Sequence, residues 1–513
     1  MVVIYKQSPS KLTERRIDPW HYQPSFEKQI NKIAKNLGNL SLESVIDSEH
    51  GVSSGATPLG ANYLEKGRVR FYRTSEVEDM FLVSEEAVYI TDEDDEKLKR
   101  SRLIEGDVLL TITGAKFGKS AVVGADHLPG NISQHSVRFK PKSEKIDAHF
   151  LVAYLNCNTG QIAIWREAYG ATRPAIDFPS IRALIIPKVA LDAQKYIGNK
   201  VRQAEQLRAW AKSTQTNANN LIPAYINEIE RYQHKSYRTV KINPERLDSL
   251  FYHPDYIALE SIMKSKGCKN LGLIATLIKK AWDKKRADDF EYFEIGGLDI
   301  GTGQVASANT ETSSAPSRAK TKVQQGDVLV STVRPNRKNV GFIIKNANDV
   351  EMVATSGFSV LRFSSLKEAA FYHAWLRTDD ATSQLMRWNS GSAYPAIDDN
   401  VPLNIIVPEF DKDFIDEWGQ KLLDAQFAYV YAKQLTNAAK ALVEALIEGQ
   451  LTEEQLIQAQ QALEDGDNTL DKAILNKLSS EGYAVEGAAP LFSDLDELYR
   501  LLASANADDD SED

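Results

Sequence analysis

Four short motifs occur twice in this chain, in the same order and at nearly the same separation. R-[IL]-D-x3-Y-x-P begins at Arg16 and again at Arg246, and G-D-V-L-[LV] begins at Gly106 and again at Gly326. Pro-Ala-Ile-Asp occurs at 174–177 and 395–398, and Ile-[IV]-Pro at 185–187 and 406–408. The offset of about 220 to 230 residues is far longer than a solenoid repeat. The duplication therefore predicts two domains of one fold, related by pseudo-twofold symmetry.

Each repeat contains the same kind of strand. The segments 107–113 and 327–333 are rich in β-branched residues and each follows a glycine, which is typical of a buried strand after a turn. Other β-rich stretches lie earlier, at 69–73 and 291–295. We predict a mixed α/β (α+β) fold with globular domains at 1–188 and 236–408, which suits a chain of 513 residues.

A long amphipathic helix is predicted after each domain, over 189–235 and 409–450. Apolar residues recur every three or four positions, which gives near-heptad seams, and Pro223 marks a break in the first helix. We expect an antiparallel, coiled-coil-like pair of about 43 Å, or about 13 base pairs, holding the domains apart. The seam residues are Ile197, Val201, Ala204, Leu207 and Ala211, then Phe414, Trp418, Leu422, Ala425, Tyr429, Leu435, Ala438, Leu442 and Ala445.

The negative charge is concentrated at the C-terminal end. The net charge is −10, but residues 451–513 hold 16 Asp and Glu against three Lys and Arg. The remaining 450 residues carry 58 basic and 55 acidic side chains. Because the body of the protein is mildly basic, a nucleic acid partner is compatible with the composition.

A basic turn follows the G-D-V-L strand in both repeats. Gly114-Ala-Lys-Phe-Gly-Lys-Ser120 is one residue short of a phosphate-binding loop, and the second copy, Arg334-Pro-Asn-Arg-Lys-Asn339, has lost the glycines. A nucleotide site is therefore rejected. Cations on a turn after a rigid strand can instead contact phosphates or guanine edges.

Further basic, amide and aromatic residues accompany the two turns. Tyr169–Arg173 and Asn389–Tyr394 form loops with different polar tips on a shared scaffold, as two domains reading two sequences would need. The predicted DNA contacts are Arg70, Arg73, Lys116, Lys119, Gln134, His135 and Arg173 in the first repeat, and Lys285, Arg318, Lys320, Arg334, Asn336, Arg337, Lys338 and Tyr394 in the second.

The order of these motifs over about residues 10–450 resembles the specificity subunit of type I restriction-modification enzymes. The pieces that carry the resemblance are G-D-V-L-[LV], Ser331–Asn339, Asn131–His135, and the Pro-Ala-Ile-Asp and Ile-[IV]-Pro motifs. The first basic turn departs from the Arg-Pro-Asn-Arg form of the second, so we expect the two domains to read different half-sites.

The resemblance implies a non-catalytic DNA reader. Each domain would be a target-recognition domain that reads half of a bipartite, asymmetric site in double-stranded DNA, with the helices setting the gap. The chain would recruit two adenine methyltransferase subunits and motor-nuclease subunits in the cytoplasm. It would bind no cofactor itself, because S-adenosylmethionine, ATP and Mg²⁺ would be held by those partners.

Two other functions were considered. A DNA-reading adaptor of another phage-defence methylase would have the same sequence features. Pro254-Asp255 and Asp283-Lys284-Lys285 imitate the PD…D-x-K pattern of a nuclease active site, but the first repeat has no counterpart of the lysine. A methyltransferase would need an Asn/Asp-Pro-Pro-Tyr/Phe loop, and Asp18-Pro19-Trp20 lacks the second proline.

Residues 451–513 form a separate acidic tail. Thr452-Glu-Glu-Gln455 is a capping box, and Ser493–Asp496 predicts a second helix start. We expect a disordered end at 507–513. The helical part would dock on a partner subunit, cover a basic groove as an internal DNA mimic, or remain a solvated appendage.

The sequence contains no membrane span and no disulfide framework. No apolar run approaches about 18 residues, and residues 1–16 lack the apolar core of a signal peptide. Cys157 and Cys268 have neither partners nor metal-ligand spacing, so we expect reduced thiols.

Overall fold

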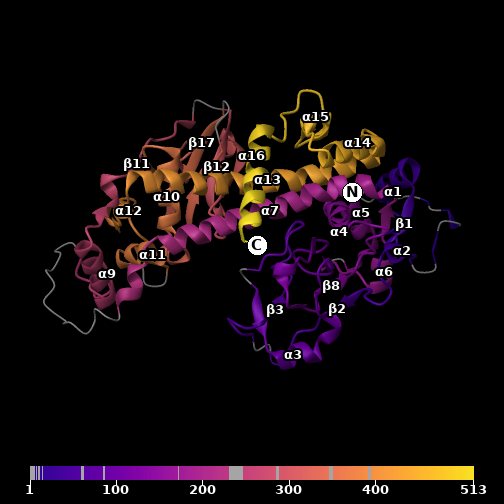
Figure 1. The fold of residues 1–513 in the computed structure, drawn as a ribbon, viewed down its shortest axis with the longest axis horizontal. Helices are drawn as coiled ribbons and strands as arrows, with labels where there is room; N and C mark the ends of the chain where they lie inside the picture. The colour runs from indigo at the N-terminus through magenta and orange to yellow at the C-terminus, as the bar shows by residue number, and fades with distance from the viewer. Residues whose placement is uncertain are drawn as a thin grey trace. The chain divides into compact units, whose positions relative to one another are not determined.

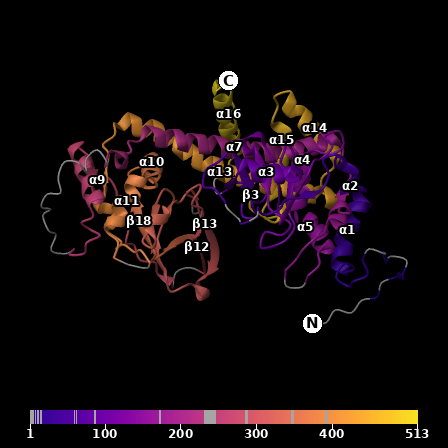
Figure 2. The ribbon, with the colours of Figure 1, turned by 90° about the horizontal axis from the view of Figure 1, so that it is seen from below.

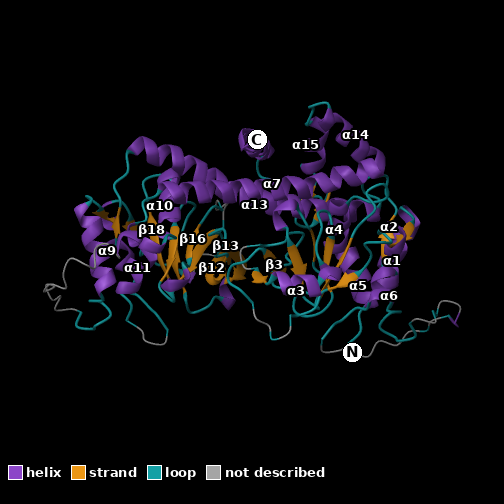
Figure 3. Cartoon of the chain, turned by 60° about the horizontal axis from the view of Figure 1, so that its bottom comes forward, coloured by secondary structure: helices purple, strands orange, loops and turns teal. Residues whose placement is uncertain are grey.

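The chain folds into two compact units. The computed structural model describes residues 16–58, 60, 63–84, 87–170, 173–229, 246–284, 288–345, 350–390 and 394–512, and residues 6, 8, 9, 12 and 13 before them. Unit 1 comprises Met1–Leu207 and Tyr431–Asp513, and unit 2 comprises Arg208–Val430. The division falls inside the two long helices, so each unit includes half of both. Figure 3 shows strands flanked by helices in each unit.

Unit 1 contains a four-stranded sheet in the order β2-β8-β5-β6, a three-stranded sheet β4-β3-β7 and a pair β1-β9. In the three-stranded sheet, β3 runs parallel to β7 and antiparallel to β4. The strands are β1 (Asn39–Ser41), β2 (Ser53–Ser54), β3 (Val69–Tyr72), β4 (Val88–Ile90), β5 (Val108–Thr111), β6 (Ser120–Val122), β7 (Gly130–Ile132), β8 (Ser136–Phe139) and β9 (Ile185–Pro187).

Short helices connect and flank these strands. Side-chain oxygens cap several of them: Asp147 accepts hydrogen bonds from the amides of His149 and Phe150, both at 2.9 Å. The helices of unit 1 before the long ones are α1 (Pro24–Asn36), α2 (Leu42–Val45), α3 (Asp92–Lys97), α4 (Ala148–Asn156), α5 (Asn158–Glu167) and α6 (Phe178–Arg182).

Unit 2 repeats this topology. Its sheets have the orders β11-β18-β15-β16, β13-β12-β17-β14 and β10-β19, and β12 runs parallel to β17 and antiparallel to β13. Only β14 lacks a counterpart among the strands described in unit 1. The strands are β10 (Lys269–Asn270), β11 (Thr276–Leu277), β12 (Asp289–Leu298), β13 (Val305–Glu311), β14 (Ala319–Lys322), β15 (Val328–Ser331), β16 (Val340–Phe342), β17 (Glu351–Thr355), β18 (Phe358–Arg362) and β19 (Ile406–Val407).

The helices of unit 2 lie against its sheets (Figure 2). They are α9 (Pro254–Ser265), α10 (Leu366–Leu376), α11 (Asp379–Arg387) and α12 (Val401–Asn404). The predicted strands at 107–113 and 327–333 are β5 and β15, whose residues are all buried. The mixed helix and strand content and the duplication are therefore as the sequence predicted.

Two long helices, α7 (Leu191–Leu221) and α13 (Lys412–Glu448), follow the two repeats. In each unit, the halves of α7 and α13 lie side by side (Figure 1). In unit 2, the Tyr429 hydroxyl lies 3.4 Å from the Gln215 side chain, and the Arg208 guanidinium lies 5.9 Å from the Tyr429 ring centroid. The predicted seam residues are buried except Phe414 and Trp418, which are half-buried. As predicted, α7 ends before Pro223.

The R-[IL]-D-x3-Y motif forms the same clasp in both units. Arg16 donates to the backbone carbonyls of Glu167 and Ala168, at 2.6 and 3.2 Å, at the end of α5. Arg246 donates to the carbonyls of Trp388 and Asn389, at 3.0 and 2.9 Å, after α11. A guanidinium at this position satisfies orphan carbonyls and complements the helix dipole.

The other motif residues fix the clasp arginine. Asp18 accepts from Arg16 Nε at 2.7 Å, and Asp248 accepts from Arg246 Nε at 2.7 Å. The tyrosine hydroxyl of each motif donates a hydrogen bond to the backbone carbonyl of the motif arginine, at 2.6 Å in unit 1 and 2.8 Å in unit 2. The motif thus joins the start of each repeat to a helix about 140 to 150 residues later.

The acidic tail is a packed part of unit 1. It comprises α14 (Glu453–Glu464), α15 (Thr469–Leu475), the hairpin β20 (Leu478–Ser479) and β21 (Gly482–Tyr483), and α16 (Leu495–Glu512). Leu456, Leu475, Leu478, Leu498 and Leu501 are buried. The tail helices α14 and α15 lie beside the first half of α7 (Figure 1). The solvated appendage is therefore wrong, and so is the expected disorder of 507–512, because α16 continues to Glu512; Asp513 lies outside the described residues.

A buried polar cluster joins the tail to α7. Lys200 and Asp471 form an ion pair of 2.8 Å, and the side chains of both are about 1% exposed. The hydroxyls of Tyr196 and Tyr499 also donate to Asp471. Burial, together with the charge of Asp471, raises the pKa of both phenols, so they stay protonated and donate. Asp471 therefore has three donors in a site that excludes water.

The Gly-Asp pairs differ between the units. Asp327 is buried and receives Arg362 in a bidentate ion pair, at 2.7 and 2.8 Å. In unit 1 the equivalent position of Arg362 is Lys140, which donates to the carbonyl of Glu105 instead. Asp107 is equally buried, and its Oδ1 has no hydrogen-bond partner among the described residues. Burial raises the pKa of Asp107 from 3.8 to about 6.

Replacing Asp107 by Asn should therefore stabilise unit 1 at high pH. The folded state binds the Asp107 proton more tightly than the unfolded state, so stability falls as pH rises from about 4 through 6. Asp107→Asn should add about 1 to 3 kcal/mol to the free energy of unfolding at pH 8, and progressively less down to pH 4. Denaturant unfolding at several pH values measures this.

Asp327→Asn is the matched comparison, because it removes the partner of Arg362. It should lower stability by about 2 kcal/mol at both pH 5 and pH 8. A gain from Asp107→Asn that does not change with pH would contradict the assignment of buried charge to Asp107.

The tail cluster gives a second prediction. Lys200→Met leaves Asp471 buried without its cation and should cost about 3 to 5 kcal/mol, with release of the tail to protease. Lys195→Met is the control, because Lys195 pairs with Glu464 at the surface and should cost less than about 1 kcal/mol. Equal effects of the two substitutions, in thermal unfolding and limited proteolysis, would show that the cluster does not hold the tail.

Candidate nucleic-acid interface

Three turns meet at one edge of unit 1, joined through the backbone of Ile112. The Ile112 amide donates to the carbonyl of His135 at 2.9 Å, and the Ile112 carbonyl accepts from the amide of Ile176 at 3.2 Å. We call the β5–β6 turn (112–119) turn A, the β7–β8 turn (133–135) turn B, and the loop 169–175 turn C. Residues 171 and 172 of turn C are outside the described chain.

Thr332 makes the same two bonds in unit 2. Its amide donates to the carbonyl of Gly357, and its carbonyl accepts from the amide of Ile397, both at 2.9 Å. Turn A of unit 2 is 332–339, turn B is 356–357 and turn C is 389–396, without residues 391–393, which are not described. The duplicated Pro-Ala-Ile-Asp motif thus anchors turn C to turn A in both units.

Turn A of unit 2 is held in a strained form that exposes its tip. Arg334 and Lys338 have φ angles of 53° and 55°, in the left-handed region that non-glycine residues rarely adopt. The Arg334 guanidinium lies 5.1 Å from the ring centroid of Tyr394, and Lys338 pairs with Asp379 at 2.8 Å. Asn336 and Arg337, between these anchors, are exposed.

Turn A of unit 1 has its lysines paired with acidic side chains. Lys116 Nζ donates to Glu78 and, at 2.5 Å, to the carbonyl of Ser75. Lys119 pairs with Asp79 at 3.0 Å, and Asp79 also accepts from Lys440 of α13 at 2.6 Å. Burial raises the pKa of Asp79, but the hydrogen bonds and charges of Lys440 and Lys119 outweigh it and hold that pKa below its ordinary value.

Turn B also differs between the units. In unit 1 it carries Gln134 and His135, both exposed, and Thr57 contacts the Gln134 amide oxygen. In unit 2 the same turn carries only Ser356 and Gly357, and the Ser356 amide donates to the carbonyl of Arg318 at 2.8 Å. Arg318 therefore lies beside turn B, although it immediately precedes β14.

Of the other predicted contacts, two lie on these turns, and Arg70 lies on β3 beside the start of β7, at the opposite end from turn B. Arg173 and Tyr394 are exposed on turn C, and Tyr394 is 67% exposed. Arg73 pairs with Glu76 at 2.8 Å just after β3, and Arg70 donates to the carbonyl of Asp126 at 2.7 Å. Lys320 is exposed on β14. Lys285 lies outside the described residues, and base or phosphate contact by each residue stays a prediction.

Sequence reasoning missed Glu78, Asp79 and Lys440. Glu78 and Asp79 lie about 40 residues before the lysines they bind, and Lys440 is 361 residues from Asp79. The acidic run after β3 is visible in the sequence, but nothing there connects it to turn A.

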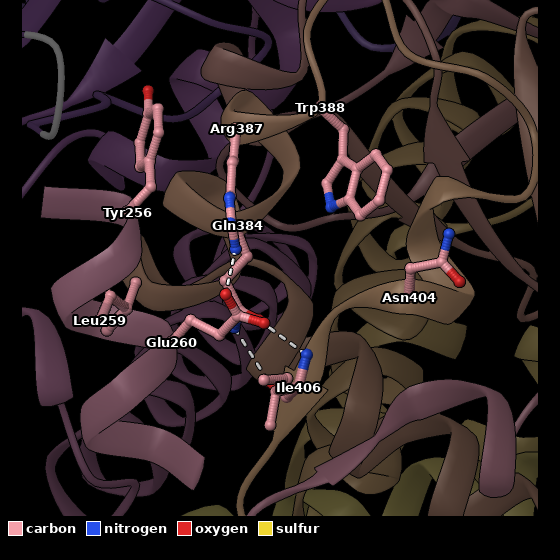
Figure 4. Close-up of a pocket in the computed structure, with 8 residues that line it drawn as sticks. All are labelled: Tyr256, Leu259, Glu260, Gln384, Arg387, Trp388, Asn404 and Ile406. Atoms are coloured by element: carbon pink, nitrogen blue, oxygen red, sulfur yellow. Dashed lines mark hydrogen bonds and ion pairs between the residues drawn. The ribbon is translucent and has the colours of Figure 1, made fainter. Parts of the chain in front are cut away.

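A small cavity in unit 2 is lined by α9, α11 and the chain around β19 (Figure 4). Its volume is about 30 Å³, room for a water molecule or two. Glu260 and Arg387 pair across one side, and the Gln384 amide exchanges two hydrogen bonds with the backbone of Ile406. These polar groups are hydrogen-bonded or ion-paired within the protein, so we interpret the cavity as a packing defect and not as a ligand site.

The described residues contain neither a metal-binding cluster nor a membrane-spanning helix. No group of three or more His, Cys, Asp or Glu side chains is arranged to hold a metal ion within the described ranges. No described helix is long and apolar enough to cross a membrane. Both cysteines are free thiols, as predicted.

Residues 38–218, which contain the sheets and turns of unit 1, match the family described as Type I restriction modification DNA specificity domain. The first repeat is a type I DNA specificity domain. This confirms the resemblance inferred from the repeated motifs. The match includes turns A, B and C of unit 1 and nearly all of α7.

Relatives of the specificity domain are distant. The type I restriction enzyme EcoBI specificity subunit of Escherichia coli is 24% identical over 206 residues, or 40% of this chain. The chain spans only 42% of the length of that curated relative in the alignment. The S subunit from M. genitalium is 13% identical, over 81% of this chain and 96% of its own, with a TM-score of 0.37. The HsdS subunit from Thermoanaerobacter tengcongensis is 15% identical, over 81% and 97%, with a TM-score of 0.28.

Proposed function

We propose that this chain is the DNA-reading specificity subunit of a type I restriction-modification system and catalyses no reaction itself. One observation carries the proposal: residues 38–218, most of which lie in unit 1, match a DNA specificity domain, and unit 2 repeats the sheet orders, the Arg clasp and the three-turn edge of unit 1. Two such domains with different side chains on their turns fit a target of two unlike halves.

The chemistry of the turns suits DNA. Arg337 and Asn336 are the residue types that bind guanine and adenine edges bidentately in the major groove. Gln134 offers the same amide geometry to adenine. Exposed Lys320, Arg318 and Arg173 can neutralise phosphates, which would make the affinity depend steeply on salt.

The partners follow from this role. Double-stranded DNA is the ligand, and two adenine methyltransferase subunits and motor-nuclease subunits would assemble with the chain. S-adenosylmethionine, ATP and Mg²⁺ would be bound by those subunits. This chain would determine which DNA sequence the assembly recognises and how far apart the two halves of that sequence lie.

The long helices would act as a ruler between the two half-sites. The 31 residues of α7 make a rod of about 46 Å. The contacts of Tyr429 with Arg208 and Gln215 support an antiparallel, coiled-coil-like pairing of α7 and α13. Such a pair is stiffer than a loop linker, so its length would fix the gap.

Deleting the gene should remove N6-methyladenine from one split, asymmetric motif in the genome of the native host. Single-molecule sequencing with and without the gene measures this, and restoring the gene should restore the motif. If every methylated motif persists in the deletion strain, and the purified complex binds no DNA in preference to competitor, the proposal is wrong.

Lengthening both helices should widen the gap between the half-motifs without changing either half. Four residues inserted after Leu207 and four after Val430 add about one turn, or about 6 Å, to each helix. These points avoid the contacts of the tail with α7 between Ala190 and Gln206. The expected gap is about two base pairs longer, and sequencing of the methylated motif measures it.

An insertion of four residues in α13 alone is the control. It puts the apolar seams of α7 and α13 out of register and should abolish methylation of the motif. An unchanged gap with full methylation by the doubly extended protein would contradict the ruler.

A further inference from the structure

We infer that the two domains present their base-reading side chains on different turns, turn B in unit 1 and turn A in unit 2. The inference rests on the proposed function and deepens it. It names Gln134 and His135 as specificity-determining residues of one half-site, and Asn336 and Arg337 of the other. The lysines of turn A in unit 1 are assigned a positioning role instead.

The scaffold of the two edges is the same, so their side chains can be compared turn by turn. Ile112 and Thr332 make equivalent backbone bonds to turns B and C. The side chains at the tips of the turns can therefore be compared at equivalent positions, apart from β14, which has no described counterpart in unit 1.

Turn A is occupied in unit 1 and open in unit 2. Lys116 and Lys119 are neutralised by Glu78 and Asp79, and releasing them to bind phosphate or base would leave two carboxylates at the DNA surface. Asp79 is held further by Lys440, which leaves little freedom for rearrangement. In unit 2, no ion pair or hydrogen bond of the Arg337 or Asn336 side chain occurs among the described residues.

Turn B shows the opposite pattern. In unit 1 it carries an amide and an imidazole, both exposed, each able to donate and accept at base edges. The Gln134 oxygen accepts from the hydroxyl of Thr57, which is itself exposed and uncharged. In unit 2 it carries Ser356 and a buried Gly357, neither of which extends far from the backbone. A Cβ at Gly357 would approach Ile295 Cδ1 to 2.8 Å, so Gly357 is packed against β12, and the short side chain of Ser356 is the one that this turn exposes.

The backbone bonds make these residues suitable for side-chain tests. His135 holds Ile112 through its carbonyl, and Arg337 donates its amide to the carbonyl of Arg334 at 3.0 Å. Truncating either side chain to alanine leaves these bonds in place. A change in recognition can therefore be separated from a change in folding.

The test is a methylome in the native host, with the chromosomal gene replaced by each of four double or single variants. Gln134→Ala/His135→Ala should lose base preference in one half-motif, by about tenfold in the ratio of cognate to non-cognate methylation. Asn336→Ala/Arg337→Ala should do the same in the other half only. Ser356→Ala should leave both half-motifs and the extent of methylation unchanged. Lys116→Gln/Lys119→Gln, which leaves Glu78 and Asp79 without these cations, should lower the extent of methylation without relaxing either half-motif.

The outcomes separate this inference from the proposed function. If no motif depends on the wild-type gene, the proposed function fails and the inference with it. If the motif depends on the gene but Lys116→Gln/Lys119→Gln relaxes a half that Gln134→Ala/His135→Ala leaves intact, only the inference is overturned. Thermal unfolding of each purified variant excludes misfolding, and Gln134→Glu, which repels phosphate without truncation, gives a second test of turn B.

Discussion

The three-turn edge depends on one peptide unit in each domain. The residue after the central buried strand, Ile112 or Thr332, uses both its amide and its carbonyl to fasten two other turns. Because β5 and β15 are buried along their whole length, the close packing of the sheet core fixes the positions of Ile112 and Thr332. Side chains on the three turns can therefore change without moving the edge, which is what a reader with variable specificity requires.

The duplicated motifs and the variable tips have different roles. Arg16 and Arg246 bind helix-terminal carbonyls, Pro-Ala-Ile-Asp ties turn C to turn A, and Ile-[IV]-Pro forms β9 and β19, which pair with β1 and β10. Each is a backbone interaction that needs a particular residue type wherever the fold is repeated. Within the described parts of the chain, the side chains at 134–135 and 336–337, positions that differ between the repeats, make no bond to the backbone, and Gln134 accepts only from the Thr57 side chain. Duplication thus marks the scaffold, and divergence marks the candidate contacts.

The sequence predicted what local pattern determines. The helix seams, the break at Pro223, the capping box at Thr452 and both buried strands follow from periodicity and turn chemistry within a few residues. It could not predict pairings between distant residues. Lys119 and Asp79 are 40 residues apart, and Lys200 and Asp471 are 271 residues apart. For the same reason the acidic composition of the tail predicts a solvated appendage, a partner-binding segment or a DNA mimic, and it does not reveal that the leucines of the tail pack in unit 1.

The buried ion pair of the tail is made with α7. Tyr196 and Lys200 of α7 are buried under it, and with the offset of 221 between the repeats their counterparts in α13 are Glu417 and Lys421. Those two side chains are exposed and pair with each other at 2.8 Å. A Lys buried against Asp471 would be destabilising without the tail, whereas Glu417 and Lys421 need no cover. The sequences of both the tail and the helices therefore determine that the tail packs on α7. The tail supplies the buried carboxylate of Asp471, and α7 supplies the buried cation of Lys200, whereas the equivalent lysine of α13 is exposed.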